Sequence, residues 1–398
     1  MHARVFFVGL LVTVFAFHSG CRPQGSSTPA ELPAGKVLPM RHARTLTVVE
    51  HNGFHVVDLK AAISGWGKAA SGPEQRARLV LVPEGQLAPE LTGELLGATL
   101  IRTPVQRIAV NYVPFEAMLS ALGVADRLVA VGGTFSYDDA VYQRVRSGEL
   151  RQVGYGWHSP PQLDALVRAQ PGAFLMALGD IAHADSLPRI AALNIPVVPM
   201  FMDAETTYLG RVEYLRLVGL LVGKLTEADA YLAQVEAEVA RLKVVASVQP
   251  RQRLLWAWFN GGDKWAVTVR NADAQLLRDA NVELVMGEAD DPRQDVFSWV
   301  STEQLLRKAA DVDVWIFRDS HSTPFSDFGL LRHFKAWREG RTYAADQQKK
   351  AERNAYEFYE IGAIRPDYLL GDIIKAVHPQ IRPEPFRYLR RESQPAQP

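Results

Sequence analysis

The feature that most restricts the fold is the stretch from Thr206 to Ser247, which contains no proline and only isolated glycines. Its second half, TEADAYLAQVEAEVARLKVVAS, is filled with Ala, Glu, Leu and Lys, which favour helices, and Thr226 is a good N-cap. This composition predicts a helix of about six turns. Because the sequence pattern changes on both sides of it, we expect this helix to cross between two folded lobes as a stiff connection.

Short apolar runs alternate with helical patterns on both sides of the long helix. Residues 105–205 contain four strand-like runs, RIAVN, LVAVGG, AFLMAL and IPVVPMF, with helical patterns between them. Residues 251–380 repeat this scheme, beginning with RLLWAWF. Short buried strands separated by helices indicate parallel sheets. The sequence therefore predicts an α/β protein with two Rossmann-like lobes, each with a parallel sheet, joined by connecting helices in residues 206–250.

The segments outside the two lobes have their own patterns. Residues 37–104 show short β-like runs broken by glycine, which predicts a small β-rich N-terminal unit with antiparallel strands. The C-terminal tail, residues 381–398, is proline-rich and charged, and we expect its end to fray.

The first twenty residues predict export from the cytoplasm. Arg4 precedes an apolar run, Val5 to Phe17, that is too short to span a bilayer as a lasting helix and is typical of a secretory signal peptide, residues 1–20. Small residues then precede Cys21, and this arrangement resembles a bacterial lipoprotein box, although His18 stands where that box usually has an aliphatic residue. We expect Cys21 to be lipidated and residues 21–36 to form a flexible tether to the membrane. The alternative is a buried or incidental cysteine.

The composition excludes several classes of function. Lys and Arg number 44 and Asp and Glu number 44, so there is no net charge to attract nucleic acid, and we find no local basic patch. A single cysteine excludes a disulfide framework, a zinc cluster with several thiolates and an iron–sulfur centre.

Two further classes are weak alternatives. A zinc or manganese carrier needs about three histidines and a carboxylate around one ion, whereas His158, His183 and His321 are scattered over predicted loops. A secreted hydrolase is suggested only by the adjacent residues Asp319, Ser320 and His321, which point apart on an extended loop and lack a GxSxG elbow. We therefore expect a protein that is not an enzyme and has no resident metal or cofactor.

Five motifs stand in order around the long helix: RIAVNYVPFEAMLSALGVADRLVAVGG, VGYGWHSPPQLDALVRAQPGAFLMAL, NIPVVPM, FSWVSTEQLLRKAADVDVWIF and IRPDYLLGDIIKAVHPQ. Together they resemble the substrate-binding proteins of ABC importers, in the helical-backbone class that includes vitamin B12 and ferric siderophore binding proteins. The resemblance covers residues 107–378 and is specific for the family but not for the ligand. It implies a class III periplasmic binding protein fold. The stretch NAYEFYEIGAIRPD, residues 354–367, is similar to that of corrinoid or iron-complex carriers.

The ligand of such a protein is expected between the lobes, where loops leave the carboxyl ends of the strands. Aromatic side chains at these positions suit a bulky, flat, partly polar ligand such as a corrin, a haem or a siderophore complex. The candidate ligand contacts are Tyr112, Tyr137, Trp157, Trp258, Trp265, Trp299, Arg318, Tyr356 and Tyr359.

Among these candidates Arg318 has a distinct role, since its guanidinium could hold a ligand carboxylate; the alternative is a salt bridge with Asp319. A haem would also need an axial ligand, for which Tyr112, Tyr155 and His321 are candidates.

The resemblance also implies partners. Family members dock to arginines of the membrane permease through one outer carboxylate on each lobe, and the matching positions are Asp164 and Glu303. Both lie near predicted helix N-termini, where a negative charge is favoured with or without a partner. We expect an extracytoplasmic, monomeric, lipid-anchored protein that captures an iron complex or corrinoid and delivers it to an ABC permease and its ATPase. A binding or sensor module with the same cleft and no importer is the alternative.

Overall fold

The computed structural model describes residues 32, 34–63, 65, 68, 72–156, 158–178, 181–269, 272–286, 295–317, 329 and 331–392. The predicted signal peptide, Cys21 and most of the predicted tether lie outside the described residues. No helix in the described ranges is both long and apolar enough to cross a bilayer.

Lobe one contains a five-stranded parallel sheet in the order β10-β9-β6-β7-β8. Its strands are β6 (Ile108–Val110), β7 (Leu128–Val131), β8 (Arg151–Gln152), β9 (Ala173–Ala177) and β10 (Val197–Met200). Its helices are α1 (Val113–Ala121), α2 (Asp139–Arg146), α3 (Leu163–Ala169), α4 (Ile181–Ala184) and α5 (Leu187–Ala191). Strands β6 and β9 are apolar and fully buried, as expected for a parallel sheet covered on both faces, whereas the edge strand β8 is exposed.

Lobe two contains a seven-stranded sheet in the order β14-β12-β11-β15-β16-β19, with β13 also paired to β11. Its strands are β11 (Arg253–Phe259), β12 (Trp265–Thr268), β13 (Glu283–Leu284), β14 (Phe297–Val300), β15 (Val314–Phe317), β16 (Thr342–Ala344) and β19 (Arg390–Arg391). Its helices are α8 (Ala272–Asp279), α9 (Thr302–Ala309), α10 (Lys335–Arg338) and α12 (Pro366–Val377). A smaller pair, β17 (Lys349–Lys350) and β18 (Ala355–Tyr356), leads into α11 (Glu357–Glu360). Short 3-10 helices occur at η1 (Gly93–Leu95), η2 (Ala125–Arg127), η3 (Met202–Ala204), η5 (Leu331–His333), η6 (Ala351–Arg353) and η7 (Pro379–Ile381).

The two-lobed α/β fold is confirmed, but the sheet of lobe two is mixed rather than purely parallel. Only β11, β13, β15 and β16 pair in parallel, while β12, β14 and β19 are antiparallel to their neighbours. The cause at β12 is a tight turn after β11, where Gly261 and Gly262 have φ of 89° and 61° and the Lys264 N–H donates to the Gly261 carbonyl at 3.2 Å. A turn this short can join only antiparallel strands.

The connecting segment between the lobes contains two helices. Helix α6 (Tyr208–Val222) ends at Gly223, whose φ of 73° is left-handed, and α7 (Leu225–Ser247) begins two residues later. Lys224 is the N-cap of α7 and makes no side-chain capping hydrogen bond, so the prediction of Thr226 as N-cap was wrong. The position of the cap is set by the sharp reversal at Gly223, which the helical composition of the segment does not reveal.

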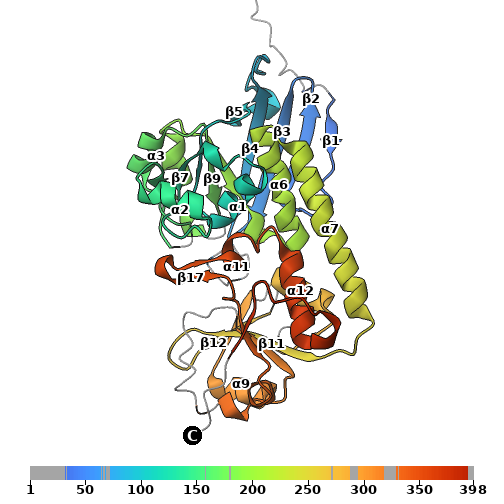
Figure 1. The fold of residues 1–398 in the computed structure, drawn as a ribbon. Coiled ribbons are helices and arrows are strands. Elements are labelled where there is room, and N and C mark those ends of the chain that lie inside the picture. The colour runs from blue at the N-terminus through green and yellow to red at the C-terminus, as the bar shows by residue number, and fades with distance from the viewer. Residues whose placement is uncertain are drawn as a thin grey trace, which may run out of the picture.

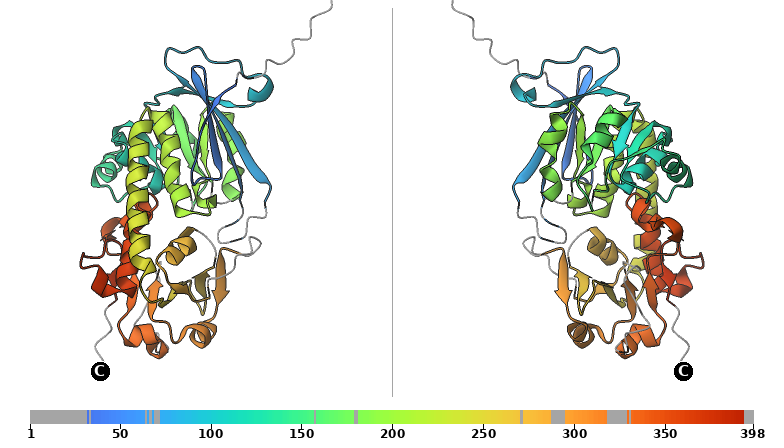
Figure 2. Two further views of the ribbon diagram at one scale, coloured as in Figure 1. Left: turned by 90° about the vertical axis from the view of Figure 1, so that its right-hand side faces the viewer. Right: turned by 90° about the vertical axis from the view of Figure 1, so that its left-hand side faces the viewer.

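Helix α7 is the element that crosses between the lobes (Figure 1). Near its beginning Tyr231 packs against the core of lobe one, and farther along the buried side chains of Val239 and Leu242 belong to the core of lobe two. At Gly219 of α6 a Cβ atom would lie 2.9 Å from Ala228 Cβ of α7, so glycine permits the two helices to pack closely. In the side views α7 descends from the upper body of the molecule to lobe two (Figure 2).

The N-terminal unit is a sheet that shares its core with lobe one. It contains β1 (Lys36–Leu38), β2 (Leu46–His51), β3 (Phe54–Ala62), β4 (Glu74–Pro83) and β5 (Thr99–Thr103), of which β1 to β4 are antiparallel and β5 is parallel to β4. Side chains alternate between faces along each strand. One face, including Leu46 and Leu79, joins the core of lobe one and α6, and the opposite face, including Val56 and Val80, forms a small separate core.

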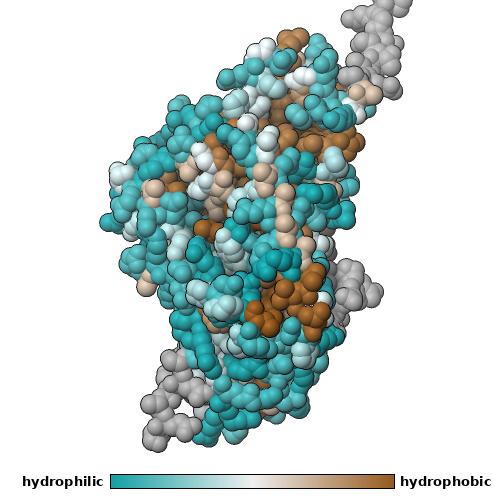
Figure 3. Space-filling model, turned by 45° about the vertical axis from the view of Figure 1, so that its right-hand side comes forward, coloured by the Kyte–Doolittle hydropathy of each residue, from teal (hydrophilic) through white to brown (hydrophobic). Residues whose placement is uncertain are grey.

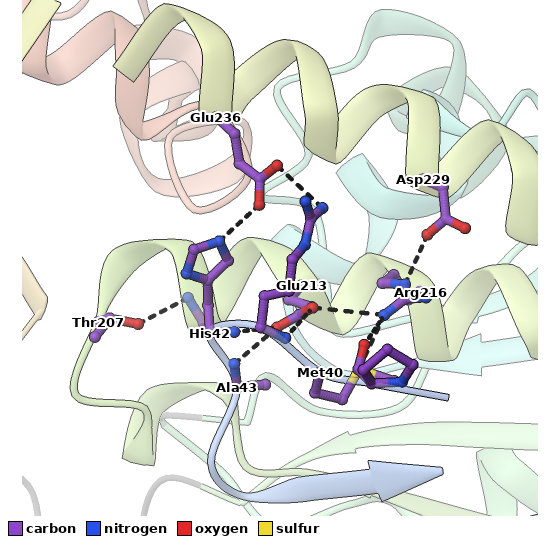
Figure 4. Close-up of polar contacts among 11 residues, drawn as sticks. Met40, His42, Ala43, Thr207, Glu213, Arg216, Asp229 and Glu236 are labelled. Carbon is purple, nitrogen blue, oxygen red and sulfur yellow. Dashed lines mark hydrogen bonds and ion pairs between the residues drawn. The ribbon is translucent and has the colours of Figure 1, made fainter. Parts of the chain in front are cut away.

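Two buried carboxylates attach this sheet to the rest of the protein. Glu213 of α6 is fully buried and accepts hydrogen bonds from the backbone N–H groups of Arg41, His42 and Ala43 at 2.7–2.9 Å (Figure 4). Glu205, just before α6, accepts from the next two N–H groups, those of Arg44 and Thr45, at 2.9–3.0 Å. The segment 41–45 therefore directs five successive N–H groups at two carboxylates.

Ion pairs with both connecting helices surround this attachment. Arg216 of α6 donates to the Pro39 carbonyl at 2.6 Å and pairs with Asp229 of α7 at 2.6 Å. The His42 ring lies 2.6 Å from Glu236 of α7 (Figure 4).

At the far end of the sheet Lys68 pairs with Asp295 of lobe two at 2.8 Å, but both side chains are exposed, so this contact contributes little to stability. The face that carries α7 is mainly hydrophilic, with separate hydrophobic areas (Figure 3).

We predict that Glu213→Gln destabilises the protein by about 2–4 kcal/mol, because an amide offers one acceptor oxygen where the carboxylate offers two, and it turns an NH₂ group toward N–H donors. Urea unfolding followed by far-UV circular dichroism measures the change. Glu238→Gln, in a half-exposed pair with Arg241 on α7, is the matched control and is expected to change stability by less than about 0.5 kcal/mol. Equal effects of the two variants would contradict the assigned role of Glu213.

Candidate ligand-binding site

The candidate site begins at the edge of lobe one where β6, β7 and β9 end. Asn111 follows β6 and is fully buried. Its side-chain oxygen accepts from the Ala177 N–H at 2.8 Å, and its carbonyl accepts from the Gly156 N–H at 2.8 Å. One residue thus joins the end of β9 and the loop after β8 to the end of β6, at the edge where open α/β sheets bind ligands.

Four ring side chains, which we call the aromatic group, gather at this edge. Tyr155 lies at the centre, with ring centroids 5.7 Å from Tyr112, 5.3 Å from Phe135 and 5.3 Å from His158. The Phe135 side chain is 36% exposed and His158 is exposed, so the group presents ring surface to solvent. Burial, with Tyr112 nearby, raises the pKa of Tyr155 well above its usual value, so its hydroxyl is a neutral hydrogen-bond donor.

Glycines make this arrangement possible. A Cβ atom on Gly132 would lie 2.9 Å from the Asn111 carbonyl oxygen and 3.0 Å from the Tyr155 ring. A Cβ atom on Gly156 would lie 3.0 Å from Asn111 Nδ2. The loops after β7 and β8 therefore approach β6 more closely than any larger residue allows.

We predict that Gly132→Ala displaces Tyr155 and destabilises the protein by about 1–3 kcal/mol, because the added methyl group overlaps a backbone oxygen that cannot move easily. Near-UV circular dichroism should report the disturbed aromatic group, and chemical unfolding the loss of stability. Gly65→Ala is the control, since a Cβ atom there meets nothing within 4 Å. An unchanged aromatic spectrum in Gly132→Ala would show that the close approach does not position the ring.

A second part of the candidate site lies where lobe one, α7 and the segment after β16 meet. A cavity of about 460 Å³ opens there, with apolar and charged side chains in its wall. It is lined by Ala117, Ser120, Ala121, Tyr137, Asp138, Asp139, Ala140, Tyr231, Lys350, Glu360, Ile361 and Ile364.

Two buried glutamates lie beside this cavity. Glu116 on α1 accepts from the Ser136 hydroxyl at 2.5 Å, and Glu360 on α11 accepts from the N–H groups of Tyr137 and Asp138 at 2.5 and 3.3 Å. Burial raises the pKa of Glu360 to about 7. Burial and the charge of Glu360 raise the pKa of Glu116 well above its usual value. The sequence analysis missed both residues; an acidic residue inside the apolar run PFEAMLSAL is the signal that could have identified Glu116.

The structure brings some of the predicted ligand contacts to these two places. Tyr112 belongs to the aromatic group, and Tyr137 lines the cavity, half-buried. Tyr356 and Tyr359 lie on the lobe-two segment next to the cavity, with ring centroids 5.6 Å apart, and Tyr356 is 4% exposed. Trp157 and Arg318 lie outside the described residues, as do Ser320 and His321. These contacts remain predictions.

Two of the three predicted tryptophan contacts in lobe two, Trp258 and Trp265, are buried in its core. Trp265 is fully buried and donates its ring N–H to Thr302 Oγ1 at 2.9 Å. Its ring packs against that of Trp315, with the ring centroids 5.2 Å apart. Trp258 is 5% exposed and packs edge-on against Phe297 at 4.7 Å. In this conformation neither ring offers a ligand a surface, because helices cover both faces of the central strands. Trp299 is 36% exposed on β14, at the edge of the sheet.

The two predicted docking acids are exposed in the first turns of helices. Asp164 lies on α3 of lobe one and Glu303 on α9 of lobe two, and these two helices lie far apart (Figure 1). Neither carboxylate forms an ion pair with another residue that the structure describes. Ser301 and Gln304 cap α9 reciprocally, so Glu303 is not needed as a cap. Within the described ranges no three His, Cys, Asp or Glu side chains are placed to hold a metal ion.

Comparisons with known proteins agree with this architecture. A family model described as "Periplasmic binding protein" matches residues 109–349. No curated protein matches the sequence. Among solved structures, a periplasmic heme binding protein from Pseudomonas aeruginosa is similar with a TM-score of 0.57 and 16% identity, over 74% of this chain and 100% of that one.

Two further structures are similar in fold. The siderophore binding protein BauB, bound to ferric iron and two acinetobactin molecules, has a TM-score of 0.54 and 17% identity over 71% of this chain and 96% of its own. The periplasmic vitamin B12 binding protein BtuF of Vibrio cholerae has a TM-score of 0.51 and 12% identity over 69% of this chain and 97% of its own. At these identities the likeness concerns the fold alone.

Proposed function

Because the chain belongs to the periplasmic binding protein family, whose model matches residues 109–349, we propose that it is the substrate-binding protein of an ABC importer. It captures an iron complex, such as a ferric siderophore or haem, or a corrinoid, and delivers it to the permease and its ATPase. It acts outside the cytoplasm as a monomer that is held to the membrane through a lipid on Cys21. It catalyses no reaction and has no resident cofactor.

The observation that carries this proposal is the aromatic group at the ligand-binding edge of lobe one. Tyr112, Phe135, Tyr155 and His158 offer ring faces and edges together with polar tips, which suits a large, flat and partly polar molecule. Similar structures carry names that mention haem, a ferric siderophore complex and vitamin B12, and these ligands share that character. The rigid α7 connection supports binding with only a small closing motion.

We predict saturable binding, with a Kd on the order of 1 µM or below, of one ligand from a panel of cyanocobalamin, haemin and ferric siderophores. Quenching of intrinsic fluorescence in the purified protein measures it. Phe135→Ala should weaken binding about tenfold, because the ring is exposed at the candidate site. Phe386→Ala, which removes a half-buried ring of lobe two next to Lys375, should leave affinity unchanged. Absence of binding across the whole panel would contradict the proposed ligand class.

Charge reversal at the proposed docking acids tests the importer. Glu303→Lys and Asp164→Lys are expected to reduce ligand uptake at least about tenfold in vesicles that contain the permease and ATPase, while ligand affinity stays unchanged. Each reversal sets a lysine against the arginines that the family's permeases present. Glu90→Lys, an exposed acid of the N-terminal unit, is the control. Normal uptake by both variants would refute docking through these residues, and binding without any permease-dependent uptake would favour a sensor module.

A further inference from the structure

Lobe two reaches lobe one at a second place, separate from α7. The segment 348–361, which contains β17, β18 and α11, leaves the sheet of lobe two after β16 and lies below α1 and α2 of lobe one (Figure 1). It contacts α1 and the loop 136–139, which ends at Asp139, the first residue of α2. Besides the covalent crossing, this segment therefore forms a non-covalent contact between the lobes.

Two cations of this segment bind the same peptide carbonyl of lobe one. Arg353 donates to the Tyr137 carbonyl at 2.8 Å, and Lys350 donates to it at 2.9 Å. Both cations also pair with Asp139, at 2.6 and 2.7 Å. The Lys350 ammonium lies 4.5 Å from the centre of the Tyr137 ring, and the Arg353 guanidinium lies 4.2 Å from that of Tyr142. The Arg353 side chain is only 4% exposed, so its charge is held away from water.

Glu360 holds the opposite side of the same loop. Its carboxyl group accepts from the N–H groups of Tyr137 and Asp138, while the cations bind the Tyr137 carbonyl. Both polar groups of Tyr137's backbone are thus bound by lobe two. The hydrogen bond from the shielded Arg353 cation to the carbonyl is stronger than one at the surface.

The loop that is held in this way also carries part of the aromatic group. It leaves the carboxyl end of β7 through Gly132 and Gly133, presents Phe135 to Tyr155, and then reaches Tyr137. A Cβ atom on Gly133 would lie 3.0 Å from the Phe135 ring, so the turn is tight. Movement at Tyr137 must therefore displace Phe135, two residues earlier.

We propose that Lys350, Arg353 and Glu360 are positioning residues: they clamp the loop 136–139 and so hold Phe135 and the lobe spacing in the ligand-binding arrangement. This inference rests on the proposed function, since it concerns the affinity for that ligand. Arg353 belongs neither to the aromatic group nor to the lining of the cavity, so it acts on the ligand through the loop, whereas Lys350 and Glu360 hold the loop and also line the cavity. The conformation with the clamp formed retains ligand, and its release opens the site.

The clamp is also sensitive to pH. Charged or titratable groups around Glu360 come from every neighbouring element: Glu116 from α1, Asp138, Asp139 and Tyr137 from the loop, Tyr231 from α7, and Lys350 and Arg353 from its own segment. Burial raises the pKa of Glu360 to about 7, so the clamped state binds the proton more tightly than an open state with a solvated carboxyl group. The stabilisation is therefore present at low pH and is lost as pH rises through about 7.

Amide hydrogen exchange in the ligand-free protein tests the clamp directly. Arg353→Met and Lys350→Met are expected to speed exchange in residues 133–142 at least about tenfold, with the central strand β9 unchanged, and Arg353→Lys should restore most of the protection. Arg338→Met, which removes an exposed arginine of α10 bonded to the His333 carbonyl, is the matched control. If Arg353→Met does not fold, Lys350→Met carries the test. Unchanged exchange in residues 133–142 overturns the proposal.

The pH profile distinguishes positioning from a general structural role. After correction for intrinsic exchange rates, residues 133–142 of the wild-type protein should lose protection between pH 6 and 8. Glu360→Gln removes the titrating group, so the protection of residues 133–142 should no longer change between pH 6 and 8. Its level should be lower than in the wild-type protein at pH 6, because the amide offers one acceptor oxygen to two N–H donors. If residues 133–142 lose protection with rising pH in Glu360→Gln as they do in the wild-type protein, the role of Glu360 is overturned.

Ligand dissociation completes the test. Arg353→Met should release the ligand found by titration about tenfold faster, and an unchanged rate would overturn the link between clamp and affinity. If no panel ligand binds the wild-type protein, the proposed ligand class fails, while exchange in residues 133–142 still decides whether the clamp exists.

Discussion

The burial of two carboxylates against five successive N–H groups is the interaction on which the packing of the N-terminal sheet, α6 and lobe one depends. Glu205 and Glu213 accept hydrogen bonds from the N–H groups of residues 41–45, and a buried N–H group without an acceptor is costly. The N-terminal sheet can then cover α6, which is buried along nearly its whole length. Lobe one, the sheet and α6 therefore share one core, and α7 starts from a rigid base.

The two connections between the lobes have different physical characters. Helix α7 is covalent, continuous and embedded in both cores, so it resists bending. The contact of residues 348–361 with lobe one combines hydrogen bonds and ion pairs to the loop 136–139 with Ile361, which packs against the core of lobe one. A helix limits the range of lobe movement, whereas a non-covalent contact can form and break within that range. The ligand-binding edge of lobe one lies next to the second connection.

Much of the fold could be predicted from local patterns, while less of the site could. The apolar run AFLMAL predicts a buried strand, and the proline-free stretch that ends at Ser247 predicts a long helix. Both predictions rest on composition and on the spacing of apolar residues, which are local properties of the chain. Burial is not local. Trp258 and Trp265 lie near strand ends or loops, which is where ligand contacts are expected. Packing on both faces of the mixed sheet nevertheless buries them in the core. Glu116 and Glu360 come from distant parts of the chain, so no local pattern joins them.

The sequence by itself determined the order of strands and helices, the long connecting helix and the resemblance to periplasmic binding proteins, because each follows from residues close together in the chain. Only the tertiary structure decided which side chains reach solvent at the edge of lobe one. It also decided that Glu213 faces residues 41–43, and that Arg353 and Glu360 hold Tyr137 from opposite sides. These contacts join residues separated by 170 positions or more, and they arise only when packing removes water from the polar groups and brings their partners together.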